Sequence, residues 1–539
     1  MKTILTILLI ITALNSSLSA KKNITLKWLK QQPTSYAKDF YIWRYLNQNI
    51  TPKEANKALA QVRRLNNKIL YRYINKSKDE TLKDYKSCMK AKTKDLIGKK
   101  PYCIEAGLSV YDATKLSKKD LTLVLNKVKD EYPLLADKLK ILNSPTPFQT
   151  LASSEAKTIF DTFNQVGGVY RVKHFNQYLP KQLLKKLKYE KKFAQTIKLI
   201  VTNLNMRKSQ ISLLQLSPEN LKYKSVFHLA INAIRHKKED LALIYLEDAY
   251  TKAYYQMQKD NITFWQYQLT TDKKYLELLN KSWDVNLYTL YAKNILKQKH
   301  TNIIYDIKLL KDNPKYTYDI SDPFAWLKVL KQSKKMDDKK LKKYQNMFTS
   351  EETLGHLSFV KERYDRYRNS YFVTPYENYM RTTKKNMSSL IYAIGRQESR
   401  FIPTSLSTAY AMGTMQIMPF LSKALAKQLK DPYDIDMQLD AKTNIRYAKH
   451  HLKYLKRAVK HPLFIAYAYN GGIGFTKRLL KQKLFSKGKY EPYLSMELLP
   501  YDETKKYGKK VLANYFIYQN HLNNKNKISF DSLIEGIKN

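Results

Sequence analysis

The sequence predicts a mainly α-helical fold whose long N-terminal part is an α-solenoid. No glycine occurs between residues 169 and 354, and the prolines of this stretch are confined to positions 180, 218, 314 and 323. Glycine and proline are the residues that most often interrupt helices, so their scarcity favours helices with tight connections. Apolar residues within the stretch recur at helical spacing, which gives each helix one apolar face to bury.

One helical hairpin can be recognised directly from this pattern. An apolar stripe runs over residues 226–233 and a second runs over 242–249, with the polar segment 235–240 between them. Similar units follow, but they share no fixed-period consensus. The repeat is therefore predicted to be structural rather than a readable sequence code.

The first twenty residues have the organisation of a secretory signal peptide. Lys2 precedes an apolar run from Ile4 to Leu14, and small residues follow before Lys21. The apolar run is too short to span a membrane, and no later segment is long and apolar enough to do so. We therefore expect an exported protein with no integral membrane segment.

The two cysteines, Cys88 and Cys103, favour a disulfide over a metal site. In an oxidising compartment they could close a loop of about 15 residues, worth on the order of 3 kcal/mol, and two free buried thiols are the alternative. The sequence lacks Cys-x-x-Cys and His-Glu-x-x-His, and the adjacent His450 and His451 would point to different helix faces. We expect no metal, and the absence of a phosphate-binding glycine loop predicts no cofactor.

Glu398 is the candidate catalytic group. It is the only acidic residue between positions 378 and 430, and it ends a helical pattern that contains Leu390, Ile391 and Ile394. That spacing places Glu398 on the apolar side of the helix, where burial favours a protonated carboxyl group that can act as an acid. The alternative is an ordinary glutamate at a helix end, either solvated or paired with Arg396 or Arg400.

Four blocks occur in order over about 110 residues and support the catalytic interpretation. The blocks are Glu398–Ser399, Tyr410–Pro419, Ala468–Gly474 and Pro500–Thr504. Together they resemble the catalytic domain of the soluble lytic transglycosylases, the lysozyme-like enzymes of bacterial cell-wall turnover. A Ser407 precedes the second block, as it does in that family.

Three positions depart from the family pattern. Tyr410 replaces a glycine, Thr414 replaces a leucine and Gly471 replaces an alanine. A loop glycine often marks a positive φ, where a bulky side chain is disfavoured. We therefore expect the loop around Tyr410 to differ in shape from that of the family.

The resemblance implies a peptidoglycan lytic transglycosylase that cleaves the MurNAc-β-1,4-GlcNAc bond without water and leaves 1,6-anhydroMurNAc ends, working from strand ends. It implies that Glu398 acts first as general acid and then as general base. One carboxylate suffices when the 2-acetamido group of the substrate stabilises the anomeric centre and its C6 hydroxyl attacks. A lysozyme-type hydrolase of the same fold and a non-catalytic peptidoglycan-binding scaffold are the alternatives.

The resemblance also assigns supporting roles. Ser407, Tyr469 and Glu503 are expected to support catalysis. Gln416 and Asn470 offer amide groups to the N-acetyl groups of the sugars, and Met418 offers an apolar wall. For Glu503 the alternative is a glutamate that stabilises the start of a helix after Pro500.

The larger members of that family carry a helical superhelix bent into a ring, a helical linker domain and a lysozyme-like domain. The corresponding division here is a signal peptide at 1–20, a superhelical domain at 21–305, a linker domain at 306–369 and the catalytic domain at 370–539. The fold class is therefore all-α, and the expected location is the periplasm.

The net charge of +51 favours a polyanionic partner. Peptidoglycan glycan strands meet this condition because their stem peptides carry carboxylates. Nucleic acid is the rival polyanion, and the signal peptide argues against it. We expect a monomer that binds peptidoglycan and no nucleic acid, with peptidoglycan synthases as candidate protein partners.

Overall fold

The computed structural model describes residues 23–482 and 484–538. The expected signal peptide at 1–20 lies outside this described part. The described chain is built from helices, and its one regular sheet has two strands of two residues each. The prediction of a mainly α-helical fold is confirmed.

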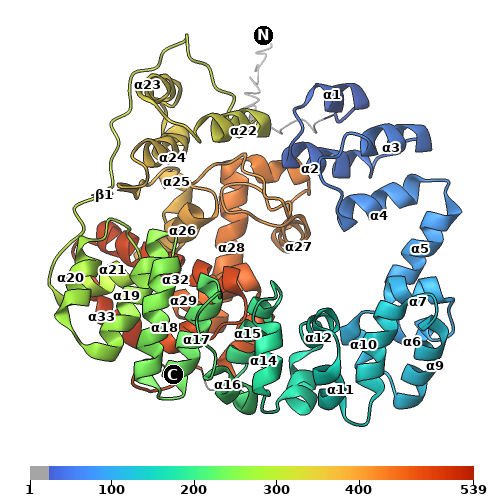
Figure 1. The fold of residues 1–539 in the computed structure, drawn as a ribbon. Coiled ribbons are helices and arrows are strands. Elements are labelled where there is room, and N and C mark those ends of the chain that lie inside the picture. The colour runs from blue at the N-terminus through green and yellow to red at the C-terminus, as the bar shows by residue number, and fades with distance from the viewer. Residues whose placement is uncertain (1–22, 483, 539) are drawn as a thin grey trace, which may run out of the picture.

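The first 21 α-helices follow one another around a ring, which runs from blue through green in Figure 1. Its first half comprises α1 (Leu26–Gln31), α2 (Tyr36–Tyr45), α3 (Pro52–Leu59), α4 (Asn67–Lys76), α5 (Glu80–Lys90), α6 (Thr93–Leu96), α7 (Pro101–Gly107), α8 (Val110–Ala113), α9 (Lys118–Val128), α10 (Pro133–Asn143), α11 (Pro147–Ser153) and α12 (Ala156–Phe163). Its second half comprises α13 (Gly168–Tyr170), the π-helical turn η1 (Arg171–Phe175), α14 (Lys181–Leu187), α15 (Phe193–Val201), α16 (Arg207–Leu213), α17 (Tyr223–Arg235), α18 (Glu239–Lys252), α19 (Gln256–Thr270), α20 (Lys273–Lys281) and α21 (Leu287–Ile295). We call α1–α21 the superhelix.

The predicted hairpin is the pair α17 and α18. Both apolar stripes are buried, since Val226, Ala230 and Ala233 face Ala242, Leu246 and their neighbours in the core. The polar segment between the stripes forms the turn, where Lys237 adopts a positive φ. Alanines at the contact let two helices approach closely, which explains the tight pairing.

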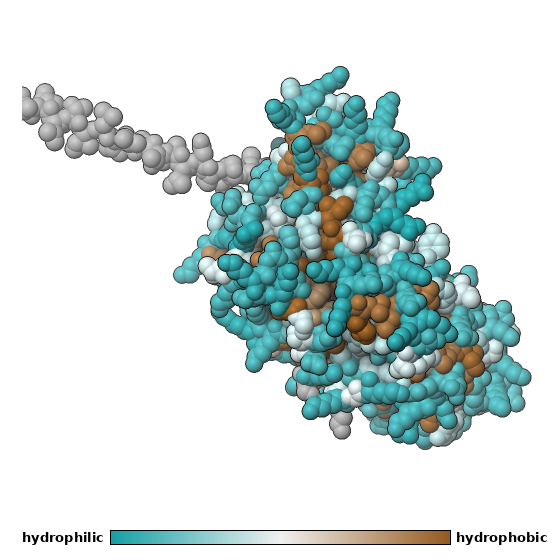
Figure 2. Space-filling model, turned by 90° about the vertical axis from the view of Figure 1, so that its left-hand side faces the viewer, coloured by the Kyte–Doolittle hydropathy of each residue, from teal (hydrophilic) through white to brown (hydrophobic). Residues whose placement is uncertain are grey.

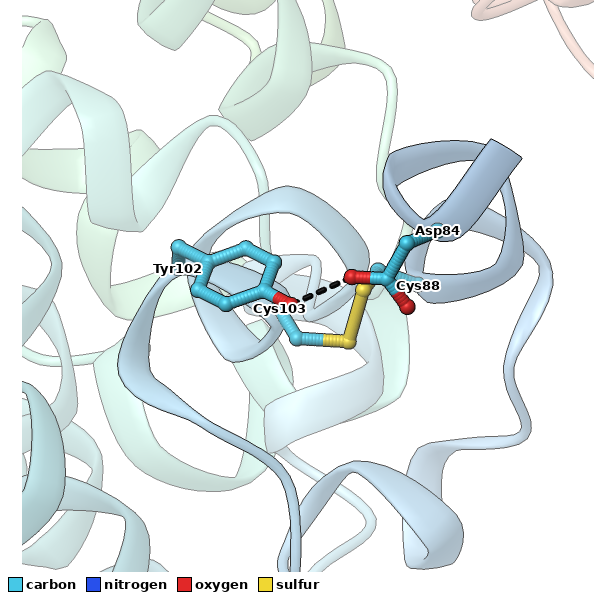
Figure 3. Close-up of a disulfide and its surroundings, with 4 residues drawn as sticks. All are labelled: Asp84, Cys88, Tyr102 and Cys103. Carbon is cyan, nitrogen blue, oxygen red and sulfur yellow. Dashed lines mark hydrogen bonds between the residues drawn. A yellow bond between two sulfur atoms is a disulfide. The ribbon is translucent and has the colours of Figure 1, made fainter. Parts of the chain in front are cut away.

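Cys88 of α5 and Cys103 of α7 form a disulfide in the superhelix (Figure 3). Both cysteines are buried. Beside them the hydroxyl group of Tyr102 donates a hydrogen bond to Asp84, again between α7 and α5. The disulfide therefore joins α5 to α7, with the short helix α6 between them in sequence.

A small segment with its own core follows the superhelix. It comprises β1 (Ile303–Ile304), α22 (Pro323–Gln332), α23 (Asp338–Met347), the short 3₁₀ turn η2 (Glu351–Thr353), α24 (Leu354–Tyr364) and β2 (Ser370–Tyr371). The strands pair in parallel, with Ile303 opposite Ser370. We call this stretch, from β1 to β2, the linker segment, and its core is centred on Trp326 and Phe348.

The C-terminal domain is organised around one long helix. It comprises α25 (Glu377–Met380), α26 (Lys385–Glu398), α27 (Pro419–Leu429), the 3₁₀ turn η3 (Ile435–Leu439), α28 (Ala441–Val459), α29 (Pro462–Gly471), α30 (Ile473–Leu480), α31 (Tyr493–Glu497), α32 (Asp502–Leu522) and α33 (Phe530–Glu535). The long helix α32 packs against both α26 and α29. Gly508 permits the second contact, because a Cβ there would lie 2.1 Å from the ring of Tyr467.

A buried ion pair of the C-terminal domain is hydrogen-bonded to the superhelix. Lys509 of α32 binds Glu497 of α31, and Tyr288 of α21 donates a hydrogen bond of 3.1 Å to the same carboxylate. Burial raises the pKa of Glu497, but Lys509 and Lys505 hold that pKa at about 2. The carboxylate is therefore charged and its partners come from both parts of the molecule.

The start of the superhelix closes back on the rest of the chain. Helices α1–α4, which we call the N-terminal module, share one apolar core with Phe324 of α22 and with Leu406, Tyr410 and Met412 of the C-terminal domain. Figure 1 shows this module beside α22 and near α27, on the opposite side of the ring from α19–α21. The ring is thus closed by contacts between segments far apart in sequence.

The surface is dominated by hydrophilic side chains. Figure 2 shows one face on which hydrophobic residues form only small, separate patches. Within the described residues, no helix combines the length and the apolar character that a membrane span needs.

Candidate active site

Glu398 is the last residue of α26, and the turn after it bends sharply. The apolar face of α26 is buried, in agreement with the predicted spacing, and Glu398 itself is partly buried. Arg400 and Phe401 both adopt positive φ, which turns the chain away from the helix axis. Ser399 fastens this turn, because its hydroxyl group donates to the carbonyl oxygen of Thr414 at 2.7 Å and accepts from the amide of Ile402 at 2.9 Å.

The carboxyl group of Glu398 is favoured in its protonated form. Its pKa is raised from 4.5 to about 8 as the net result of three causes. Burial, the largest, raises the pKa, a hydrogen bond of 2.7 Å from the hydroxyl group of Tyr507 to Oε1 of Glu398 lowers it, and the negative charge of Glu503 raises it. Glu398 therefore carries a proton at neutral pH and can donate it.

The two arginines next to Glu398 bind a different carboxylate. Nη2 of Arg396 lies 2.8 Å from Oε1 of Glu362, and Nε of Arg400 lies 3.0 Å from Oε2 of Glu362. Glu362 belongs to α24 of the linker segment and is 4% exposed. This arrangement disfavours the alternative in which an arginine neutralises Glu398.

The loop at 405–417 forms one side of the site. It is held by two isolated β-bridges, Leu406 to Met412 and Met412 to Ile417. The hydroxyl group of Ser407 accepts a hydrogen bond of 2.9 Å from the amide of Ala411. Ser407 thus lies within this loop, where its contact stabilises the turn.

Gln416 and Gly413 shape the end of the same loop. The side-chain amide of Gln416 donates 2.9 Å hydrogen bonds to the carbonyl oxygens of Ser405 and Gly413. Gly413 has a φ of 83°, and a Cβ there would lie 2.3 Å from the carbonyl oxygen of Gln438. Met418 follows as the half-buried residue that precedes α27.

Tyr469, Asn470 and Glu503 form the other side. The hydroxyl group of Tyr469 donates a 2.7 Å hydrogen bond to the carbonyl oxygen of Met415. Burial raises the pKa of Tyr469, and the charge of Glu398 adds to this effect. Nδ2 of Asn470 lies 3.5 Å from Oε1 of Glu503.

Glu503 occupies the first turn of α32 and is exposed. Its position satisfies the helix-start alternative, and its charge also raises the pKa of Glu398. The two interpretations of Glu503, a helix-start glutamate and a residue that supports Glu398, are therefore compatible with each other.

Tyr507 is the contact of Glu398 that the sequence interpretation missed. It lies four residues after Glu503, one turn further along α32, and is buried. Residues four apart share one helix face, so a search for further polar groups on the Glu503 face would have found it.

The three departures from the family pattern have different surroundings. Tyr410 adopts a φ of 72°, in the left-handed region that a glycine reaches freely, and is 1% exposed. Thr414 is fully buried, and its carbonyl oxygen accepts the hydrogen bond from Ser399. Gly471 ends α29 beside Thr504 and Phe475.

A large cavity lies between the superhelix and the C-terminal domain, and it reaches Pro500 and Tyr501 just before α32. It has a volume of about 1200 Å³, and Phe475 and Tyr501 form part of its wall. Its charged lining is mainly basic and includes Lys173, Arg235, Arg478 and Lys481, with Glu491 among them. Among the described residues, no three His, Cys, Asp or Glu side chains gather in a way that could hold a metal ion.

Comparison with known proteins finds a family match for the part of the chain that carries this site. Residues 375–491 match the family described as the transglycosylase SLT domain. The soluble lytic murein transglycosylase of Salmonella typhimurium is 33% identical over 155 residues, which is 28% of this chain and 24% of that protein. The protein of the same name from Escherichia coli is 33% identical over 145 residues, 26% of this chain and 22% of its own. The aligned region thus spans about a quarter of the length of these relatives.

Two solved structures are similar over most of the chain at low identity. The lytic transglycosylase Slt of Pseudomonas aeruginosa is 16% identical, with a TM-score of 0.47, and covers 92% of this chain and 82% of its own. The 70 kDa soluble lytic transglycosylase of Escherichia coli is also 16% identical, with a TM-score of 0.46 and coverage of 92% and 88%.

The expected resemblance to the soluble lytic transglycosylases is confirmed, and the matched residues 375–491 contain the first three of the four sequence blocks. The matched region contains Glu398, Ser407, Gln416, Met418, Tyr469 and Asn470. This chain therefore carries, at residues 375–491, a domain of the transglycosylase SLT family.

Proposed function

We propose that this protein is a peptidoglycan lytic transglycosylase that uses Glu398 as its single general acid and base. The observation that supports this proposal most strongly is the environment of Glu398, whose pKa is raised to about 8 by burial within a transglycosylase SLT domain. A carboxyl group that is protonated at neutral pH can donate to the oxygen of a glycosidic bond. The relatives with aligned SLT domains are named lytic murein transglycosylases.

The first step breaks the bond between C1 of MurNAc and the bridging oxygen. Glu398 gives its proton to that oxygen, which leaves with GlcNAc, and the 2-acetamido oxygen of MurNAc stabilises the positive charge at C1. Tyr507 orients the carboxyl group through its hydrogen bond. Tyr469, fastened to Met415, lies where its phenol can face the developing charge.

The second step closes the anhydro ring. The C6 hydroxyl group of the same MurNAc attacks C1 and gives its proton to the Glu398 carboxylate, which restores the acid. No water is consumed, and the nucleophile is already held near the reacting carbon. Ser407 and Glu503 support the site from its two sides, while Gln416, Met418 and Asn470 bind the sugars.

The location, the substrate and the mode of cleavage belong to the same proposal, and the ring and its charge support them. We assign the periplasm as the location, with export directed by residues 1–20, and peptidoglycan strands as the substrate. The basic cavity next to Tyr501 suits the carboxylates of stem peptides. A closed ring favours a free strand end over an internal bond, so we propose exolytic cleavage by a monomer, with peptidoglycan synthases as candidate partners. The division into 21–305, 306–369 and 370–539 belongs to the same proposal.

Digestion of purified sacculi tests the reaction. We expect muropeptides with 1,6-anhydroMurNAc ends, which are lighter than reducing ends by one water, as measured by mass spectrometry. Glu398→Gln keeps the shape of the side chain and removes the acid, so we expect a loss of about a hundredfold or more in rate.

Asp260→Asn is the matched control for that substitution. Asp260 is also a buried acid, in α19 of the superhelix, and burial raises its pKa to about 7. We expect this variant to digest sacculi at the wild-type rate. Reducing ends alone would identify a hydrolase of the same fold, and digestion by Glu398→Gln at the wild-type rate would overturn the assignment of Glu398. A wild-type protein that binds sacculi without digesting them would be a binding scaffold.

A further inference from the structure

The loop at 405–417 is in contact with a part of the chain more than three hundred residues away. Tyr410 lies at the tip of this loop, buried against α2 of the N-terminal module. Its ring centroid is 5.5 Å from that of Phe40 and 5.3 Å from that of Trp43. Two aromatic partners on one helix make a specific docking site for this side chain.

Polar contacts close around the same side chain. Nδ2 of Asn66 donates a 3.0 Å hydrogen bond to the hydroxyl oxygen of Tyr410. Nζ of Lys68 donates a 2.6 Å hydrogen bond to the carbonyl oxygen of Ala409 and lies 4.8 Å from the centre of the Tyr410 ring. The N-terminal module therefore holds the tip of the loop through both its backbone and its side chain.

A second pair of contacts supports the neighbouring part of the loop. Arg44 of α2 forms a bidentate ion pair with Asp436, and one of its two hydrogen bonds measures 2.8 Å. Both side chains are about nine-tenths buried. Asp436 lies in η3 next to Gln438, whose carbonyl oxygen is packed against Gly413 of the loop.

The loop in turn carries groups of the candidate active site. Ser407 lies three residues before Tyr410, and the carbonyl oxygen of Ser407 accepts a 3.0 Å hydrogen bond from the Tyr410 amide. Met415, at the other end, accepts the hydrogen bond from Tyr469. Displacement of the loop tip would move the sugar-facing residues on one side of Glu398.

The conformation of Tyr410 shows that this contact has a cost. Its φ of 72° is a left-handed conformation that glycine adopts freely and a tyrosine adopts at a penalty. The packing on Phe40 and Trp43 and the hydrogen bond from Asn66 offset that penalty. The contacts with the N-terminal module thus explain why a bulky residue is tolerated at this position.

We propose that Tyr410 is a positioning residue through which the N-terminal module holds the substrate loop of the SLT domain in its active geometry. The proposal rests on the proposed function, because activity is its readout. The contacts of α2 and α4 with the loop at 405–417 then both close the ring and hold the active site in place.

The test compares substitutions at the contact by the kinetics of peptidoglycan digestion. Tyr410→Gly relieves the positive φ and removes the ring, and we expect kcat/KM to fall about tenfold because small displacements of binding groups are costly. Tyr410→Phe keeps both aromatic contacts, so it should retain most of the wild-type value. Trp43→Ala, on the opposite side of the contact, should lower kcat/KM to a similar extent as Tyr410→Gly.

Trp28→Ala is the matched control. Trp28 belongs to the same module but packs on Tyr41 and on Phe324 of the linker segment, with ring centroids 4.9 and 5.9 Å apart. Both tryptophan variants should lower the Tm of the whole protein, and only Trp43→Ala should lower kcat/KM. The double variant Trp43→Ala with Tyr410→Gly should be no less active than Tyr410→Gly alone, because the loop is already released.

The outcomes separate this inference from the proposed function. An inactive wild-type protein would overturn the proposed function. An active wild type whose kcat/KM is unchanged in folded Tyr410→Gly and Trp43→Ala, with Tm lowered in both, would overturn the positioning role alone. Equal activity losses in Trp28→Ala and Trp43→Ala would also overturn it, since they would reflect general destabilisation.

Discussion

Two neighbours shift the pKa of Glu398 in opposite directions. The hydrogen bond from Tyr507 stabilises the carboxylate and lowers the pKa, whereas the charge of Glu503 raises it. The general acid must be protonated, so activity is expected to fall as pH rises through the pKa of Glu398 near 8. We predict that Tyr507→Phe moves this alkaline limb to higher pH and that Glu503→Gln moves it to lower pH.

The measurement is the pH profile of kcat/KM for the two variants and the wild type. Tyr507→Phe should also lower the maximal rate, because the carboxyl group loses the contact that orients it. Limbs that move in the same direction for both substitutions, or that stay at the wild-type position, would show that Glu398 is not the group that titrates.

At the residue scale, the helical spacing before Glu398 was enough to predict its partial burial and its protonated form. Tyr507 shares a helix face with Glu503, which marks it as a candidate, but its contact with Glu398 depends on how α26 crosses α32. No local pattern encodes a crossing between helices that are about a hundred residues apart. The unusual backbone at Tyr410 was predictable from the replaced glycine, but its partners Phe40 and Trp43 were not.

At the scale of elements, α24 of the linker segment supports the end of α26 through one buried carboxylate. Glu362 binds Arg396 and Arg400, which flank Glu398 in sequence. Removing one member of a buried ionic group leaves the others uncompensated. We predict that Glu362→Ala destabilises the protein by roughly 3 kcal/mol or more, measured as a fall in Tm and in the midpoint of urea unfolding.

Glu377→Ala is the surface counterpart of that substitution. Glu377 pairs with Arg381 one turn later in the chain, where both side chains are substantially exposed. An exposed pair of this kind contributes about 0.5 kcal/mol or less. A similar loss of stability in both variants would contradict the supporting role of Glu362.

The elements themselves differ in how far the sequence revealed them. The hairpin α17 and α18 and the catalytic helix α26 follow from strong apolar periodicity. The strands β1 and β2 have two residues each and pair in parallel across the linker segment. They are too short to show an alternating pattern, and no hairpin turn connects them, so the sequence does not predict them. Their pairing is set by the tertiary fold.

At the scale of the whole molecule, the charge and the closed ring act together. A net charge of +51 produces a field that attracts polyanions over a long range, among them the carboxylates of the proposed substrate, peptidoglycan. The basic cavity between the superhelix and the C-terminal domain gathers part of this charge near Tyr501, two residues before Glu503. In the proposed function the chemical step takes place at Glu398, in a partly buried environment that salt screens much less.

Salt should therefore separate binding from chemistry. The screening length falls from about 10 Å at 0.1 M salt to about 3 Å at 1 M, which removes attraction over longer distances. We predict that added salt weakens binding of Glu398→Gln to sacculi, measured by co-sedimentation, and raises the KM of the wild type. The kcat of the wild type should change little, because it reports the bound complex. A kcat that falls in parallel with binding would mean that salt acts on the site itself, and binding that is insensitive to salt would mean that the charge does not contribute to substrate capture.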